Sequence, residues 1–151
     1  MAVIELISTP EECVEAISEL ISDNAERLGI QYVGKNDERL LPRYPAVVVS
    51  GGMKRKEVHA THTFNVELYT TIWVYHAAIT KTHQERSMED MVFATALEAL
   101  LEDDKTLGQR VIFCYVESSV PGVYAPRSGR GEPVVGTKIN WYALSQKRWE
   151  D

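Results

Sequence analysis

The stretch FNVELYTTIWVY, residues 64–75, decides the fold class, because its residues alternate in character with a period of two. That period is typical of a β-strand, in which successive side chains point to opposite faces. We therefore predict a long central strand that starts at Val58 and continues through this stretch. One face would carry Phe64, Val66, Leu68, Thr70, Ile72 and Val74, and the other would carry Asn65, Glu67, Tyr69, Thr71, Trp73 and Tyr75.

The aromatic residues of the second set, Tyr69, Trp73 and Tyr75, fit two arrangements. In a sheet covered on both sides, they would lie under the first helix. Alternatively, they form an exposed aromatic stripe that another subunit covers. The polar residues that alternate with them favour partial exposure.

His59 and His62 precede this stretch and suggest a metal site. Residues three apart in one strand point to opposite faces, so these two imidazoles would not share an ion. The spacing supplies no further ligand, and we predict no metal and no cofactor. His76 and His83, beyond the strand, are interpreted as surface histidines.

Residues 8–29 carry the start and stop residues of a helix. Thr9 is the predicted N-cap, Pro10 takes the first position, Glu12 completes a capping box and Gly29 follows the last turn. One apolar stripe predicts packing by a single face: Cys13, Ile17, Leu20, Ile21 and Leu28.

After a loop with a short strand at IQYV, Pro45 introduces the β-branched strand AVVV, residues 46–49. Gly51 and Gly52 are predicted to end that strand. The basic residues that follow them would then lie at a turn: Lys54, Arg55 and Lys56.

Residues 85–109 predict a second helix, with Ser87 as N-cap and Gly108 at its end. Its predicted buried side is Met88, Met91, Val92, Thr95, Ala96, Ala99 and Leu100. Two strands follow, at residues 110–120 and 133–148. The Gly- and Pro-rich span between Val120 and Pro133 predicts an extended hairpin arm.

This order of elements predicts an α+β fold, a mainly antiparallel sheet packed by two helices, with long hairpin loops. The length of 151 residues suits a single domain, residues 1–151, with flexible ends and an extended loop at about residues 120–133. Cys13 and Cys114 lie in apolar patterns and are predicted to be buried thiols; a disulfide is the alternative.

The net charge of −6 argues against a dedicated nucleic-acid binder, because phosphate binding depends on clustered Lys and Arg. The first residues lack the basic flank and apolar run of a signal peptide, and no run of about 18 apolar residues occurs. We therefore expect a cytoplasmic protein without a membrane partner.

The sequence shows no arrangement typical of an enzyme. Ser50 is outside a G-x-S-x-G elbow, Cys114 lies within a predicted strand, and neither SGG nor GRGEP has the spacing of a phosphate loop. We predict no catalytic activity.

The charged loops are the candidate interface. Opposite charges on separate ends of a subunit suit head-to-tail contacts, which close into rings when the rotation allows. Alternatives are exposed solubilising loops, a solvated helix end, and a weak divalent-cation site at the acidic residues. The candidate residues are Lys54, Arg55, Lys56, Tyr124, Arg127, Arg130, Glu102, Asp103 and Asp104.

The element order resembles that of the tail terminator, or tail-completion, proteins of long-tailed bacteriophages. The features that carry the resemblance are the N-terminal helix, RYPAVVV, the strand FNVELYTTIWVY, the helix end ALLEDDKTLG, VIFCYV and KINWYAL. They cover most of the chain.

The resemblance implies a virion structural protein without catalysis. Such a protein forms a ring, commonly a hexamer, at the head-proximal end of the tail tube, where it stops tube growth and offers a surface to the head-tail connector protein. The implied partners are further copies of this chain, the tail tube protein, the connector, and DNA that passes through the lumen without specific binding.

Two alternatives remain open. One is another neck or head-tail joining component of similar fold. The other, from a different class, is a small cytoplasmic enzyme or ligand-binding domain, suggested by His62, Glu67 and the aromatic residues.

Overall fold

The computed structural model describes residues 6–35, 43, 45–78, 83–124 and 134–148. Within these residues the elements are α1 (Pro10–Asp23), α2 (Ala25–Leu28), β1 (Tyr32–Lys35), β2 (Ala46–Ala60), β3 (Thr63–Ala78), α3 (His83–Asp103), β4 (Phe113–Tyr124) and β5 (Val134–Arg148). The predicted α+β class is confirmed.

The described strands form one five-stranded mixed sheet in the order β1-β2-β3-β5-β4. β2, β3, β5 and β4 pair antiparallel with their neighbours, whereas β1 pairs parallel to β2. The predicted sheet was mainly antiparallel, and the observed sheet departs from a fully antiparallel one at the parallel pair β1–β2. A parallel neighbour requires the chain to return to the same end of the sheet before β2, and sequence spacing does not reveal that return.

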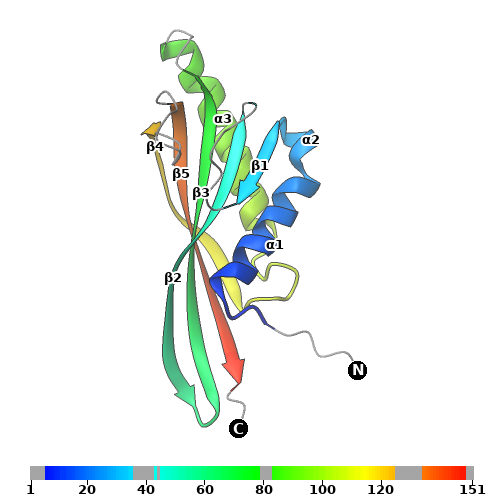
Figure 1. Ribbon diagram of the computed structural model, residues 1–151, viewed down its shortest axis with the longest axis vertical. Helices are drawn as coiled ribbons and strands as arrows, with labels where there is room; N and C mark the ends of the chain where they lie inside the picture. Colours follow the sequence, from blue (N-terminus) through cyan, green and yellow to red (C-terminus); the bar gives the residue numbers. More distant parts are fainter. Residues whose placement is uncertain (1–5, 36–42, 44, 79–82, 125–133, 149–151) are drawn as a thin grey trace.

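The described helices all cover one face of the sheet (Figure 1). α1 packs on β1, β2 and β3, and α3 packs on β4 and β5. Ile17 and Ile21 of α1 meet Leu97 of α3 and Trp141 of β5 in one core, where all four are buried. The first set of alternating residues in β3 faces this core, as predicted: from Val66 to Val74 every second residue is buried.

The predicted start of α1 is confirmed. Thr9 Oγ1 accepts a hydrogen bond from the backbone N–H of Glu12 at 3.2 Å and donates one to its carboxylate at 2.9 Å. The single predicted helix is instead two, because Asn24 leaves helical geometry at φ −112° and ψ 5°. Gly29 ends α2 in the left-handed conformation, at φ 77°, as its place in the sequence predicted.

The prediction that Gly51 and Gly52 end the second strand is wrong. β2 continues through them to Ala60 with a bulge between Gly51 and Lys54, and the turn to β3 consists of Thr61 and His62. Glycines at a bulge let two backbones approach closely: a Cβ on Gly52 would lie 2.6 Å from the carbonyl oxygen of Tyr69. A turn was predicted at these glycines, whereas the strand has a bulge there and continues.

α3 also differs from its prediction. It begins at His83, so Ser87 lies inside the helix rather than at its N-cap. Its core-facing residues include Ala94, Leu97 and Leu101, whereas Met91 and Val92, predicted to be buried, are exposed. Apolar residues occur on nearly every side of this helix, so its sequence does not define which side is buried.

The two predicted C-terminal strands are confirmed as β4 and β5. β4 continues to Tyr124, which pairs with Val134 of β5. This pairing makes β4 and β5 a hairpin. Residues 120–124 of the predicted arm belong to β4, and its remainder, residues 125–133, lies outside the described residues, as do both chain ends. At the opposite end of the sheet, β2, β3 and the end of β5 extend well beyond α1 (Figure 1).

Candidate functional site

The predicted basic residues lie in the extended part of β2 rather than at a turn. Lys54 pairs with Leu68, and Lys56 pairs with Val66, so both lysines lie on the face of the sheet that the helices cover elsewhere. Arg55 lies on the opposite face. Lys54, Arg55 and Lys56 are neighbours in sequence, but β2 places Arg55 on one face of the sheet and the two lysines on the other.

A third lysine, not predicted, joins Lys54 and Lys56 on that face. Lys147 of β5 lies opposite Phe64 of β3. The Nζ atom of Lys56 lies 5.7 Å from the centroid of the Phe64 ring. Burial, followed by repulsion from Lys56 and Lys147, lowers the pKa of Lys54. We call Lys54, Lys56 and Lys147 the basic cluster; the late strand sequence SQKR was the only hint of its third member.

The other face of the sheet, which we call the open face, carries no helix within the described residues. Four aromatic residues gather there, and we call them the aromatic patch: Tyr69, Phe113, Tyr115 and Tyr142. The ring centroids of Tyr69 and Tyr115 each lie 5.3 Å from that of Tyr142, and Phe113 lies at 6.1 Å. Tyr142 is 9% exposed, whereas Phe113 and Tyr115 are 40% and 37% exposed.

The patch contains a polar pair. The hydroxyl of Tyr142 donates a hydrogen bond to Oε1 of Glu67 at 2.9 Å, and Nε of Arg55 lies 3.9 Å from Oε2 of the same carboxylate. Burial and the bond to Glu67 raise the pKa of Tyr142, and burial also raises that of Tyr69. Arg55 thus has a partner in its own chain.

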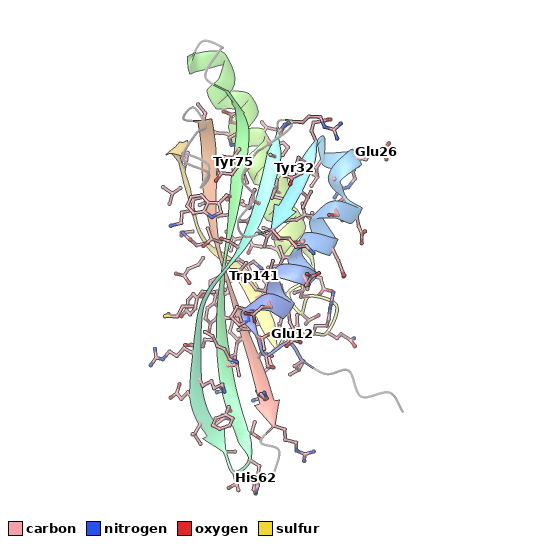
Figure 2. All side chains as sticks on the ribbon, in the orientation of Figure 1. Glu12, Glu26, Tyr32, His62, Tyr75 and Trp141 are labelled. Carbon is pink, nitrogen blue, oxygen red and sulfur yellow. The ribbon has the colours of Figure 1, made fainter. Side chains whose placement is uncertain are left out.

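The structure excludes one of the two arrangements considered for the aromatic residues of β3, that in which they lie under the first helix. α1 does not cover them; they lie on the open face. Tyr69 belongs to the aromatic patch. Trp73 and Tyr75 form a separate cluster with Ala46, Val48 and Tyr32, in which Tyr75 is buried and Trp73 partly buried. Figure 2 shows Tyr32 and Tyr75 at the end of the sheet far from His62.

The predicted acidic residues have local roles. Glu102 Oε2 lies 3.6 Å from Nζ of Lys105. The Asp104 carboxylate accepts hydrogen bonds from the hydroxyl and the N–H of Thr106 and from the N–H of Gly108, which lower its pKa. Asp104 thereby holds the turn after α3, where Gly108 adopts φ 67°. Asp103 is exposed.

The side chains of the remaining candidate residues are not described. Tyr124 ends β4, but its side chain is not described, and Arg127 and Arg130 fall within residues 125–133. Their assignment to an interface stays a prediction.

His76, interpreted above as a surface residue, is buried in β3 at 6% exposure. Its Nε2 lies 3.0 Å from Oγ1 of Thr137, and its Nδ1 lies 3.5 Å from Oδ1 of Asp90. This is the order of groups in a hydroxyl–imidazole–carboxylate triad. Because the Thr137 hydroxyl is itself buried, the arrangement ties α3 to β3 and β5 rather than presenting a nucleophile.

The prediction that His59 and His62 lie in one strand is wrong. His59 lies near the end of β2, and His62 lies in the turn at φ 67°, at the tip of the hairpin (Figure 2). Among the described residues, no group of three or more His, Cys, Asp or Glu side chains is arranged to hold a metal ion.

Cys13 and Cys114 are free and buried, as predicted. Burial raises the pKa of Cys13 to about 12 and that of Cys114 to about 11. Neither thiol is therefore a ready nucleophile.

No protein-family model matches the chain, and no curated protein is significantly similar to it. None of the described helices is both long and apolar enough to cross a membrane.

Proposed function

We propose that this protein is a structural subunit of a bacteriophage virion. It assembles with further copies into a ring at the head-proximal end of the tail tube, stops tube growth, and offers a joining surface to the head. It carries out no catalysis. The support from the sequence is the resemblance in element order, and the support from the fold is a surface suited to assembly.

The observation that carries this proposal is the aromatic patch on the open face. Phe113 and Tyr115 are well exposed although their rings lie against Tyr142. Protein interfaces are enriched in Tyr and Phe, which provide large, rigid contact area. A single-layer sheet with helices on one side leaves such a patch available to another subunit.

The remaining partners follow from the same proposal. The tail tube protein binds one end of the ring, and the head-tail connector binds the other. DNA passes through the lumen without specific binding, which suits a chain whose net charge is −6.

The first experiment measures the mass of the purified protein by light scattering in line with size exclusion, followed by negative-stain imaging of the main peak. We expect closed rings with an open centre. Addition of this protein to assembling tail tube protein should then shorten the tubes and leave a ring at one end of each tube.

The outcomes separate the alternatives. Rings that bind the connector but leave tube length unchanged would favour another neck component. A monomer at every concentration, both alone and with tube protein, would overturn the proposal. It would also direct attention to Tyr142 and Glu67 as a ligand-binding pair.

A further inference from the structure

The solvent side of α1 is uniformly acidic. The helix carries five carboxylates and no basic residue: Glu11, Glu12, Glu15, Glu19 and Asp23. All five are exposed, on the side opposite the buried stripe. We call them the acidic face. It extends over about 18 Å, at 1.5 Å per residue.

Among the described residues, most of the acidic face has no ion-pair partner. Glu15 forms an ion pair with Lys35 at 2.9 Å, and Glu12 is engaged with Thr9 at the N-cap. Glu11, Glu19 and Asp23 form no ion pair with any described residue. Figure 2 shows Glu12 at one end of this helical segment and Glu26 at the other, both on the outside.

The basic cluster has the complementary charge. Along β2, Lys54 and Lys56 lie about 7 Å apart, and Lys147 lies two strand spacings, about 10 Å, across the sheet. None of the three lysines forms an ion pair within the described part of the chain. Lys56 and Lys147 are exposed and Lys54 is partly exposed. The ends of β2 and β5 extend beyond α1 (Figure 1).

The two surfaces interact only in part inside one copy, where Glu11 and Glu12 attract Lys54. Among the causes that shift the pKa of Lys54, repulsion from the other two lysines exceeds attraction from Glu11 and Glu12. The rest of the acidic face extends away from the cluster along α1. A second copy of the chain carries a surface of opposite charge for each of the two.

We propose that the basic cluster of one copy binds the acidic face of α1 on a second copy, so that copies join head to tail. This inference rests on the proposed function and identifies the surfaces by which ring subunits recognise one another. A head-to-tail contact uses different surfaces on its two sides, and it closes into a ring when the rotation between copies allows.

A charge swap tests the contact. One variant is K54E/K56E/K147E, and the other is E11K/E19K/D23K, which spares the capping residue Glu12 and the Lys35 partner Glu15. Each variant alone places like charges at every contact, and its self-association should weaken about tenfold or more. An equimolar mixture restores opposite charges at every contact, and its association should return to within about threefold of the wild-type value.

Sedimentation velocity at low and high salt measures these associations, and circular dichroism verifies that each variant is folded. The matched control is R27E/R43E/K105E, which has the same net charge as the first variant but leaves the basic cluster intact. This control should associate like the wild type. Wild-type association should also weaken as salt increases, because screening reduces the attraction between exposed charges.

Several outcomes would overturn the inference: swapped variants that associate like the wild type, a mixture that is not rescued, or equal weakening in the control. Binding of a short DNA duplex that K54E/K56E/K147E abolishes would assign the cluster to nucleic acid instead. If the three lysines served only to prevent other strands from pairing with an exposed edge of the sheet, mixing the two variants would not restore association.

Failure of the two proposals can be distinguished. Wild-type rings that are unaffected by either swap would overturn the inference and leave the proposed function standing. A rescued mixture that forms pairs or open chains but never rings would support the contact and count against the tail-terminating ring.

Discussion

The hydroxyl of Tyr142 and the carboxylate of Glu67 are joined by a hydrogen bond of 2.9 Å between residues 75 positions apart in the chain. The bond connects β5 to β3 across the open face, in the middle of the aromatic patch. The ring of Tyr142 lies against those of Tyr69 and Tyr115, and the carboxylate of Glu67 acts on the phenols of Tyr142 and Tyr69.

This pair predicts a loss of stability at alkaline pH. Because the pKa of Tyr142 is raised above its ordinary value of 10.0, the folded protein holds the phenol proton more tightly than the unfolded chain does. The resulting stabilisation is complete below about pH 10 and is lost as the pH rises through the folded-state pKa. Y142F should therefore show a shallower fall in the free energy of unfolding above pH 10 than the wild type.

Urea titrations at a series of pH values measure this difference. Cys13 and Cys114 also have raised pKa values, but they are present in both proteins, so the comparison isolates Tyr142. Parallel pH profiles for Y142F and the wild type would contradict the assignment.

If the aromatic patch is an interface, substitutions in it should weaken assembly and leave the subunit folded. F113S/Y115S removes the two most exposed rings of the patch, and self-association should weaken about tenfold or more if the patch is an interface. V92S is the matched control, because Val92 is exposed at 68% on α3, away from the open face. Equal effects of the two variants on association would show that general surface hydrophobicity, rather than this patch, drives assembly.

The two glycines of the β2 bulge should respond differently to alanine. In G52A the new Cβ lies 2.6 Å from the backbone oxygen of Tyr69, and we expect a cost of about 1–3 kcal/mol in the free energy of unfolding. In G51A the nearest atom, Cβ of Pro10, lies at 3.4 Å, so the cost should be smaller. Thermal or urea unfolding compares them; equal stabilities would contradict the close approach.

The buried hydrogen bond between His76 and Thr137 predicts a structural role. T137V removes the hydroxyl from a buried imidazole, and should cost about 1–3 kcal/mol in the free energy of unfolding. T137S keeps the hydroxyl and is the control. If T137V were as stable as the wild type, the contact between β3 and β5 at His76 and Thr137 would not be needed for stability.

The cysteines predict slow thiol chemistry. Both are buried, so a water-soluble thiol reagent should label neither in the folded protein and both after denaturation. Rapid labelling of one thiol in the native state would show that its part of the core opens.

The sequence by itself determined the features that depend on neighbours along the chain. Thr9 and Glu12 cap α1, Gly29 ends α2, and the period of two in residues 64–75 defines which side of β3 is buried. Each is a local property, because backbone hydrogen bonds at a helix end and side-chain direction in a strand depend on residues a few positions away.

The candidate site was only partly predictable, because local patterns identify its residues but do not define which of them meet across strands. Lys54 and Lys56 were identified as charged residues, but strand alternation separated them from Arg55, and register across β3 added Lys147. Phe113 and Tyr115 alternate around the buried Cys114, a local hint that they share a face. Their meeting with Tyr69 and Tyr142 depends on how three strands align.

Only the tertiary structure decided the parallel placement of β1, the side of α3 that is buried, and the separation of the basic cluster from the acidic face. These features depend on pairing and packing between segments far apart in sequence, where several arrangements bury similar amounts of apolar surface. α3 shows the reason most clearly: with apolar residues on nearly every side, its orientation was selected by the sheet it packs against.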